Sequence, residues 1–88
     1  MKKSKKEILT EMLDMPKEVM LDIPKLTVYS DNQLTLENYN GILEYTEEYI
    51  RLKTTGKTIA ISGQNLELRT ITDIDVLIEG TIKIIEYL

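Results

Sequence analysis

Histidine, cysteine, tryptophan and phenylalanine are all absent from the 88-residue sequence. Without cysteine there is no disulfide framework, no thiolate nucleophile and no thiolate-bound zinc or iron–sulfur site. Without histidine the chain lacks the commonest general base near neutral pH and the most frequent metal ligand. These absences predict a protein that folds inside the cell, is not an enzyme, and carries no metal and no cofactor.

Long apolar runs are absent as well. No apolar run exceeds three residues, as in Val76–Ile78, whereas a membrane-spanning helix needs roughly 20. The basic residues near the N-terminus are followed by Glu7, Glu11 and Asp14, which interrupt the apolar segment that a secretion signal requires. We therefore expect a cytoplasmic protein that contacts a membrane at most peripherally.

The charge balance is acidic, with a formal net charge of −4. The first 22 residues carry five lysines and five acids, so the excess falls in the rest of the chain, where six basic residues face ten acidic ones. A nucleic-acid-binding protein needs a cationic face that displaces counterions from phosphate. The charge therefore predicts no nucleic-acid partner and leaves proteins and small molecules as ligands.

The first 24 residues are predicted to form an amphipathic helix and a linker. Ser4 followed three residues later by Glu7 is a capping box, and Pro16 ends the helical pattern. Residues 16–24 lie between two prolines and form either another helical turn or an extended linker. The apolar side of the helix expected over residues 4–15 consists of Ile8, Leu9, Met12 and Leu13.

Residues 25–88 are predicted to form one β-domain, because the apolar period changes to two after Lys25. With 42% hydrophobic and 30% charged residues, the chain has an ordinary globular composition. We expect about eight short strands, of which the first two pair with each other. The strands are expected around residues 26–28, 34–36, 42–45, 49–54, 57–62, 66–71, 74–79 and 81–88.

Turn residues between these segments favour an all-β fold of hairpins. Asn40-Gly41 is the strongest hairpin-turn dipeptide, Thr55-Gly56 is a second turn, and Gly80 separates the last two segments. We predict a small antiparallel β-sandwich preceded by a short α-helix. A short β-solenoid stays open as the alternative, because Ile61-Ser62-Gly63 is weakly echoed by Ile78-Glu79-Gly80.

Two groups of acids are close enough in sequence to be considered as catalytic carboxylates. A glycosidase needs two of them about 5–9.5 Å apart, one with a raised pKa. Solvated acids on turns are the more frequent arrangement, by about nine to one, since acids are rarely buried without partners. We therefore assign no catalytic residue and no metal ligand to these groups, which are Glu44 with Glu47 or Glu48, and Asp73 with Asp75.

The last two predicted strands carry apolar residues on both faces. Strict alternation places Ile74, Val76 and Ile78 on one face of the sheet and Leu77 on the other face. It likewise places Ile82 and Ile84 on one face and Ile85 and Tyr87 on the other. A half-buried sheet needs one apolar face, so the second must be covered by the N-terminal helix, by another sheet layer or by a partner chain. The predicted interface residues are Leu77, Ile85 and Tyr87, together with Ile8, Leu9, Met12 and Leu13.

The order of elements from Ile23 to Leu88 resembles the YabP/YqfC family of sporulation proteins, and within it the YqfC branch. The N-terminal helix also resembles that branch. The residues that carry the resemblance are Leu26-Thr27-Val28, Leu34-Thr35-Leu36, Gly41-Ile42-Leu43-Glu44-Tyr45, Ile50-Arg51-Leu52-Lys53-Thr54 with Gly56, the run from Ile59 to Leu68, and Ile78-Glu79-Gly80 with Ile82 and Ile85-Glu86-Tyr87.

The resemblance implies a protein made in the mother cell of an endospore-forming bacterium and needed for spore development. It implies no enzymatic activity, and it points to a membrane or spore-coat protein as partner. Our leading hypothesis is an assembly or adaptor module that presents its last hairpin or an edge strand. A homo-oligomer also stays open, as does attachment to a membrane or coat surface. The rival functions are a small-ligand-binding β-domain and an enzyme that uses carboxylates.

Overall fold

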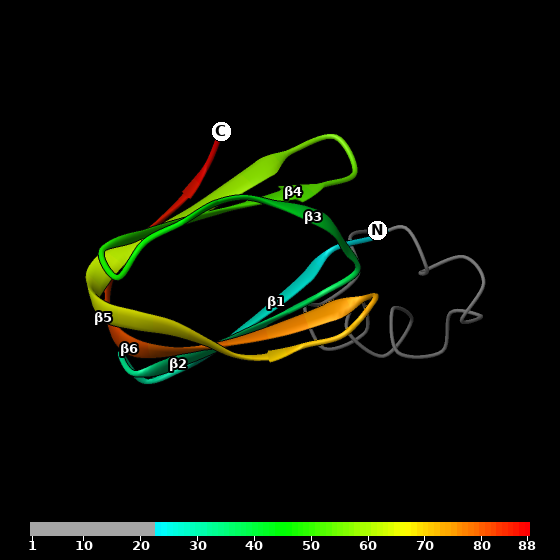
Figure 1. Cartoon of the computed structure of the whole chain (residues 1–88). Helices are drawn as coiled ribbons and strands as arrows, with labels where there is room; N and C mark the ends of the chain where they lie inside the picture. The colour runs from blue at the N-terminus through cyan, green and yellow to red at the C-terminus, as the bar shows by residue number, and fades with distance from the viewer. Residues whose placement is uncertain (1–22) are drawn as a thin grey trace, which may run out of the picture.

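The computed structural model describes residues 23–88, which form one antiparallel sheet of six strands (Figure 1). The strand order is β1-β2-β6-β5-β4-β3. Antiparallel pairing throughout confirms the all-β class and excludes the solenoid alternative, whose stacked coils would pair strands in parallel. The strands are β1 (Lys25–Tyr29), β2 (Gln33–Glu37), β3 (Tyr39–Tyr45), β4 (Tyr49–Thr54), β5 (Thr58–Ile71) and β6 (Asp75–Tyr87).

The prediction of eight strands was wrong, because two pairs of predicted segments are continuous. β5 joins the segments expected at 57–62 and 66–71, and β6 joins those expected at 74–79 and 81–88. Gly80 therefore lies within a strand and does not form a turn between two strands. A strand can bend at a glycine or at a bulge and still stay hydrogen-bonded to the same neighbouring strand. A turn would instead end the strand.

The long β5–β6 hairpin carries different neighbours at its two ends. β4 pairs with residues 58–62 of β5, whereas β2 pairs with residues 75–79 of β6. The sheet folds over between these ends, so that β3 and β4 face β1 and β2 across the interior (Figure 1). The domain is thus one strongly bent sheet in place of the predicted sandwich of separate short strands.

The bend is built from glycines and irregular pairing in β5 and β6. The register shifts between Ser62 and Gly63, and again between Gln64 and Glu67, where two residues of β5 face one residue of β6. Gly80 has a φ of 138°, a backbone conformation that residues with a Cβ rarely adopt. Bulges of this kind increase the local twist and bend the strand that contains them.

Backbone hydrogen bonds from two turns hold the bend. In the β3–β4 turn, the carbonyl oxygens of Glu48 and Glu47 accept from the amides of Gly63 at 3.0 Å and Leu66 at 2.7 Å. In the β1–β2 turn, the carbonyl oxygen of Asp31 accepts a hydrogen bond from the amide of Ile82 in β6 at 2.7 Å. The two turns therefore satisfy backbone groups where strand pairing ends, as buried polar groups require.

The core lies between the two facing halves of the sheet and is aliphatic, since the sequence contains no tryptophan and no phenylalanine. Every core side chain is at most 9% exposed, and both halves contribute. Such burial supplies the main favourable free energy of folding in a small domain. The core residues are Leu34, Leu36, Ile50, Leu52, Ile59, Ile61, Leu66, Val76, Ile78 and Ile82.

One predicted set of faces in β6 was wrong. Ile82 and Ile84 were expected on the same face, but Ile82 is buried and Ile84 is 53% exposed. The cause is a register shift: Gly63 pairs with Ile82 and Ser62 with Ile84, so Lys83 is an extra residue. Since each extra residue inverts the alternation, Ile85 packs against the core instead.

Local turn signals had mixed outcomes. The predicted pairing of β1 with β2 is confirmed, and so is the hairpin turn at Thr55-Gly56 between β4 and β5. The turn predicted at Asn40-Gly41 was wrong, because both residues lie inside β3. β2 and β3 are not neighbours in the sheet, so the chain crosses between them without a hairpin. The predicted helix over residues 4–15 lies outside the described residues.

Replacing Tyr39 with phenylalanine is expected to lower the free energy of unfolding by about 1 kcal/mol. The Tyr39 hydroxyl donates a hydrogen bond to the Thr72 carbonyl at 2.6 Å and ties β3 to the β5–β6 turn. The measurement is urea denaturation followed by circular dichroism. Tyr87→Phe is the control, because the Tyr87 ring is largely exposed, and it should leave the midpoint unchanged. Equal midpoints for both variants would show that this hydrogen bond does not stabilise the fold.

Candidate functional site

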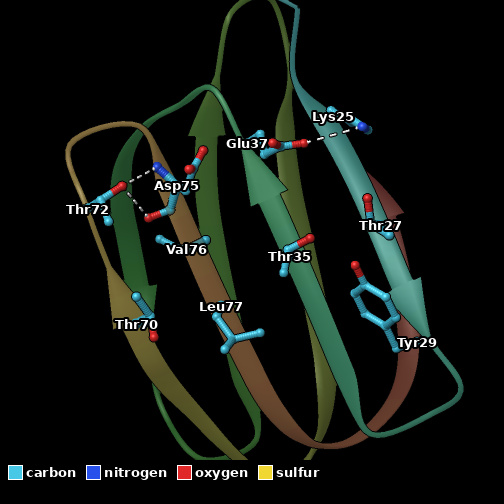
Figure 2. Close-up of a pocket in the computed structure, with 10 residues that line it drawn as sticks. All are labelled: Lys25, Thr27, Tyr29, Thr35, Glu37, Thr70, Thr72, Asp75, Val76 and Leu77. Carbon is cyan, nitrogen blue, oxygen red and sulfur yellow. Dashed lines mark hydrogen bonds and ion pairs between the residues drawn. The ribbon is translucent and has the colours of Figure 1, made fainter.

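The outward surface of one half of the sheet forms a shallow concavity of about 340 Å³ (Figure 2). At its centre, Thr27, Thr35, Leu77 and Thr70 form one row across β1, β2, β6 and β5. We call this surface the threonine face. Its lining residues are Lys25, Thr27, Tyr29, Thr35, Glu37, Thr70, Thr72, Asp75, Val76 and Leu77.

The threonine face follows from alternation in the paired strands. Leu34 and Leu36 of β2 are fully buried, so Thr35 between them points outward. Thr27 is opposite Thr35 in the register, so it lies on the same outward face. Leu77 lies between the buried Val76 and Ile78, and it is the apolar centre of this outward row.

Charged and polar pairs border the threonine face on two sides. The Lys25 ammonium lies 3.7 Å from the Glu37 carboxylate at one side, as the dashed line in Figure 2 shows. On the other side, the Glu79 carboxylate accepts from the Gln33 amide at 3.5 Å and lies 3.6 Å from the Arg69 guanidinium. Exposed pairs contribute little to stability, so their main consequence is a polar border of both signs around an apolar centre.

The β5–β6 turn forms the end of the concavity and uses its polar groups internally. The Thr72 amide donates to the Asp75 carbonyl at 2.8 Å. The Asp75 amide donates to the Thr72 hydroxyl at 2.9 Å, and that hydroxyl donates to the Asp75 carbonyl at 3.3 Å (Figure 2). A threonine hydroxyl that accepts from a nearby amide is a common way to stabilise a turn. Thr72 therefore shapes the end of the threonine face.

The acids considered as catalytic pairs lie on turns and on an edge strand. Glu44 is exposed and pairs with Arg51 at 3.7 Å. Glu47 and Glu48 are exposed, and their backbone carbonyls hold the bend. Asp73 is exposed in the β5–β6 turn, and Asp75 is half-buried at the start of β6. Among residues 23–88, no group of three or more acids is placed to hold a metal ion.

The structure does not bring the predicted interface residues of β6 onto one surface. Leu77 is the half-buried centre of the threonine face. Ile85 lies on the inner face of the sheet, where it packs against the core. Tyr87 is exposed, and the centre of its ring lies 5.9 Å from the Lys57 ammonium. The other predicted members, Ile8, Leu9, Met12 and Leu13, lie outside the described residues. The interface prediction therefore stays a prediction, with Leu77 as its best-placed residue.

Sequence reasoning missed the polar members of this surface. Thr27, Tyr29, Thr35 and Thr70 were not considered as site residues, although the signal was present. In Leu26-Thr27-Val28 and Leu34-Thr35-Leu36, a threonine lies between apolar residues on two strands that were expected to pair. That pairing alone places the two threonines opposite each other on the outward face.

A model of the YabP family matches residues 22–88, which include all six strands. The chain belongs to the YabP family. It is also 34% identical over 79 residues to a Bacillus subtilis (strain 168) protein named "Uncharacterized protein YqfC", covering 90% of this chain and 85% of that protein. No solved structure matches the chain.

Membership in the YabP family confirms the resemblance seen in the sequence. The matched residues include every residue that lines the threonine face. The name of the Bacillus subtilis relative assigns no activity. Within residues 23–88, no helix is long and apolar enough to cross a membrane.

Proposed function

We propose that this YabP-family protein is a non-enzymatic assembly or adaptor module of spore formation, and that the threonine face is the surface that binds its partner. The observation that carries the proposal is the position of Leu77. A half-buried aliphatic side chain at the centre of a concave surface, bordered by polar and charged groups, matches the arrangement of a protein interface, which has an apolar centre and a polar rim.

The electrostatics of the threonine face suit a protein partner. Lys25, Glu37, Asp75 and Glu79 place both signs of charge around the concavity. A mixed border orients a protein surface of complementary charge and disfavours a uniformly anionic partner such as nucleic acid. The family resemblance supports a partner among the membrane or spore-coat proteins of the mother cell, with this protein in the cytoplasm at their surface.

Small-ligand binding is the second candidate, and one observation favours it. The volume of the concavity, about 340 Å³, is near the lower end of the range for ligand sites, which is roughly 300–1,000 Å³. Ligand sites usually enclose most of the ligand surface, whereas this one lies on the outward side of a sheet. The space between the sheet halves, where a carrier would hold its ligand, is filled by core side chains.

Replacing Leu77 with lysine is expected to reduce partner binding at least roughly tenfold, because a charge would replace the apolar anchor. The measurement is affinity purification of the tagged full chain from sporulating cells in mild detergent, with quantitative mass spectrometry of what is bound. Spore yield is scored in parallel.

Ile84→Lys is the matched control for Leu77→Lys. Ile84 lies on the same strand, is an exposed aliphatic residue, and pairs with Ser62 in the other half of the sheet. Both variants should keep the circular dichroism spectrum of the folded protein. A partner retained by Leu77→Lys, together with normal spore yield, would remove the threonine face as the binding surface.

A further inference from the structure

β1 is an edge strand with one side unpaired among the described residues. It pairs with β2 through five consecutive residues, from Lys25↔Glu37 to Tyr29↔Gln33, without a register shift. Alternate residues of such a strand direct their amide and carbonyl groups away from the neighbour. These groups form a template for another strand unless the sequence prevents it.

The other edges of the bent sheet are irregular. β3 contains two register shifts, between Tyr39 and Gly41 and between Ile42 and Glu44. The last part of β6, which β2 does not reach, contains the extra residue Lys83. The last part of β5 is irregular at Arg69, and the amide of Leu68 already donates to the Tyr45 hydroxyl. β1 is thus the regular edge, and it contains no proline, bulge or inward charge that would block pairing.

We propose that β1 pairs antiparallel with β1 of a second copy, about a two-fold axis at Thr27. The sequence Lys25-Leu26-Thr27-Val28-Tyr29 is complementary to itself in that arrangement. Leu26 then lies opposite Val28 of the second copy, and the two Thr27 residues lie opposite each other. A symmetric contact of this type uses the same surface patch on both subunits.

Side-chain chemistry favours this register. Val28 is 44% exposed although it lies on the core side of β1, and pairing covers it with the apolar Leu26 of the second copy. Lys25 lies opposite the exposed Tyr29 of the second copy, which places an ammonium group beside an aromatic ring. No residue of like charge lies directly opposite another.

The pairing would also join the two threonine faces. Thr27 belongs to the central row of that face, so the row would continue through the axis from Leu77 of one copy to Leu77 of the other. A dimeric partner could then contact both faces at once, with a gain in avidity. The self-pairing does not depend on the proposed function, because it is measured on the purified chain alone.

Thr27→Cys tests the pairing and its register, since the natural chain has no cysteine. Directly opposite residues in an antiparallel pair have Cα atoms about 4.5–5.5 Å apart, within the disulfide range. Under mild oxidation we expect Thr27→Cys to form disulfide dimers at least roughly tenfold faster than Thr35→Cys. Thr35 is the control because it lies in the same outward row, one strand from the axis.

A second measurement avoids cysteine altogether. A contact between two five-residue strands is smaller than a standard interface, so the natural chain should dimerise reversibly and sediment faster as its concentration is raised. Val28→Lys should abolish this dependence and Ile84→Lys should retain it. Equal cross-linking of the two cysteine variants, or sedimentation of the natural chain as a monomer throughout, would overturn the pairing.

Discussion

Replacing Gly80 with alanine is expected to destabilise the domain by roughly 3–5 kcal/mol, a large part of the stability of a small domain. Gly80 has a φ of 138°, and an added Cβ would lie 2.5 Å from the Asn65 carbonyl oxygen and 2.9 Å from the Leu66 Cα. Those neighbours are backbone atoms, so the clash cannot be relieved by a side-chain rotation. The bend of β6 would have to open.

Gly41→Ala is the matched control, because a Cβ on Gly41 has nothing within 4 Å and this glycine is also within a strand. Its free energy of unfolding should change by less than about 1 kcal/mol. Urea denaturation of both variants gives the comparison. Gly63→Ala should behave like Gly80→Ala, since its Cβ would overlap the Thr81 carbonyl oxygen. A Gly80→Ala midpoint equal to that of Gly41→Ala would show that the bend tolerates a side chain.

Replacing Leu66 with alanine is expected to cost about 2–5 kcal/mol, the range for truncating a buried leucine. Leu66 is 1% exposed, and it enters the core from the irregular stretch between Gln64 and Glu67. Its amide is also held by the Glu47 carbonyl. Because the backbone around it is fixed, the cavity left by truncation should not collapse.

Leu43→Ala is the control for Leu66→Ala, because Leu43 is 47% exposed and also lies beside a register shift. Its effect should stay within roughly 0.5 kcal/mol. The free energies come from thermal and urea unfolding of the purified variants. If both leucine variants unfold at the same urea concentration, Leu66 does not form part of a closely packed core.

The residues that we propose for assembly differ from those that stabilise the fold. Gly63, Gly80 and Leu66 fix the bend, whereas Leu77 and Thr27 lie on the outward surface. Surface substitutions away from caps, buried polar groups and core contacts usually change stability little. Leu77→Lys and Thr27→Cys can therefore be tested for binding and for cross-linking in a protein that still folds.

Part of the candidate site could be predicted from the sequence. Leu77 was identified because it interrupts the apolar alternation of Val76 and Ile78. The neighbours of Leu77 were missed because the site combines four strands. Its row depends on pairing between residues 33–37 of β2 and residues 75–79 of β6, which are far apart in the chain. Loop-closing contacts of that separation leave no local pattern in one sequence.

The sequence by itself determined the all-β class, the β1–β2 and β4–β5 hairpins and the family. Local alternation and turn chemistry specify these features, because each involves residues close together in the chain. Only the tertiary structure decided that Gly63 and Gly80 bend continuous strands, that Ile85 and not Ile84 faces the core, and that Asn40-Gly41 lies within β3. The physical reason is that bulges shift the alternation by one residue, and where they occur depends on which distant strands must pair across the bend.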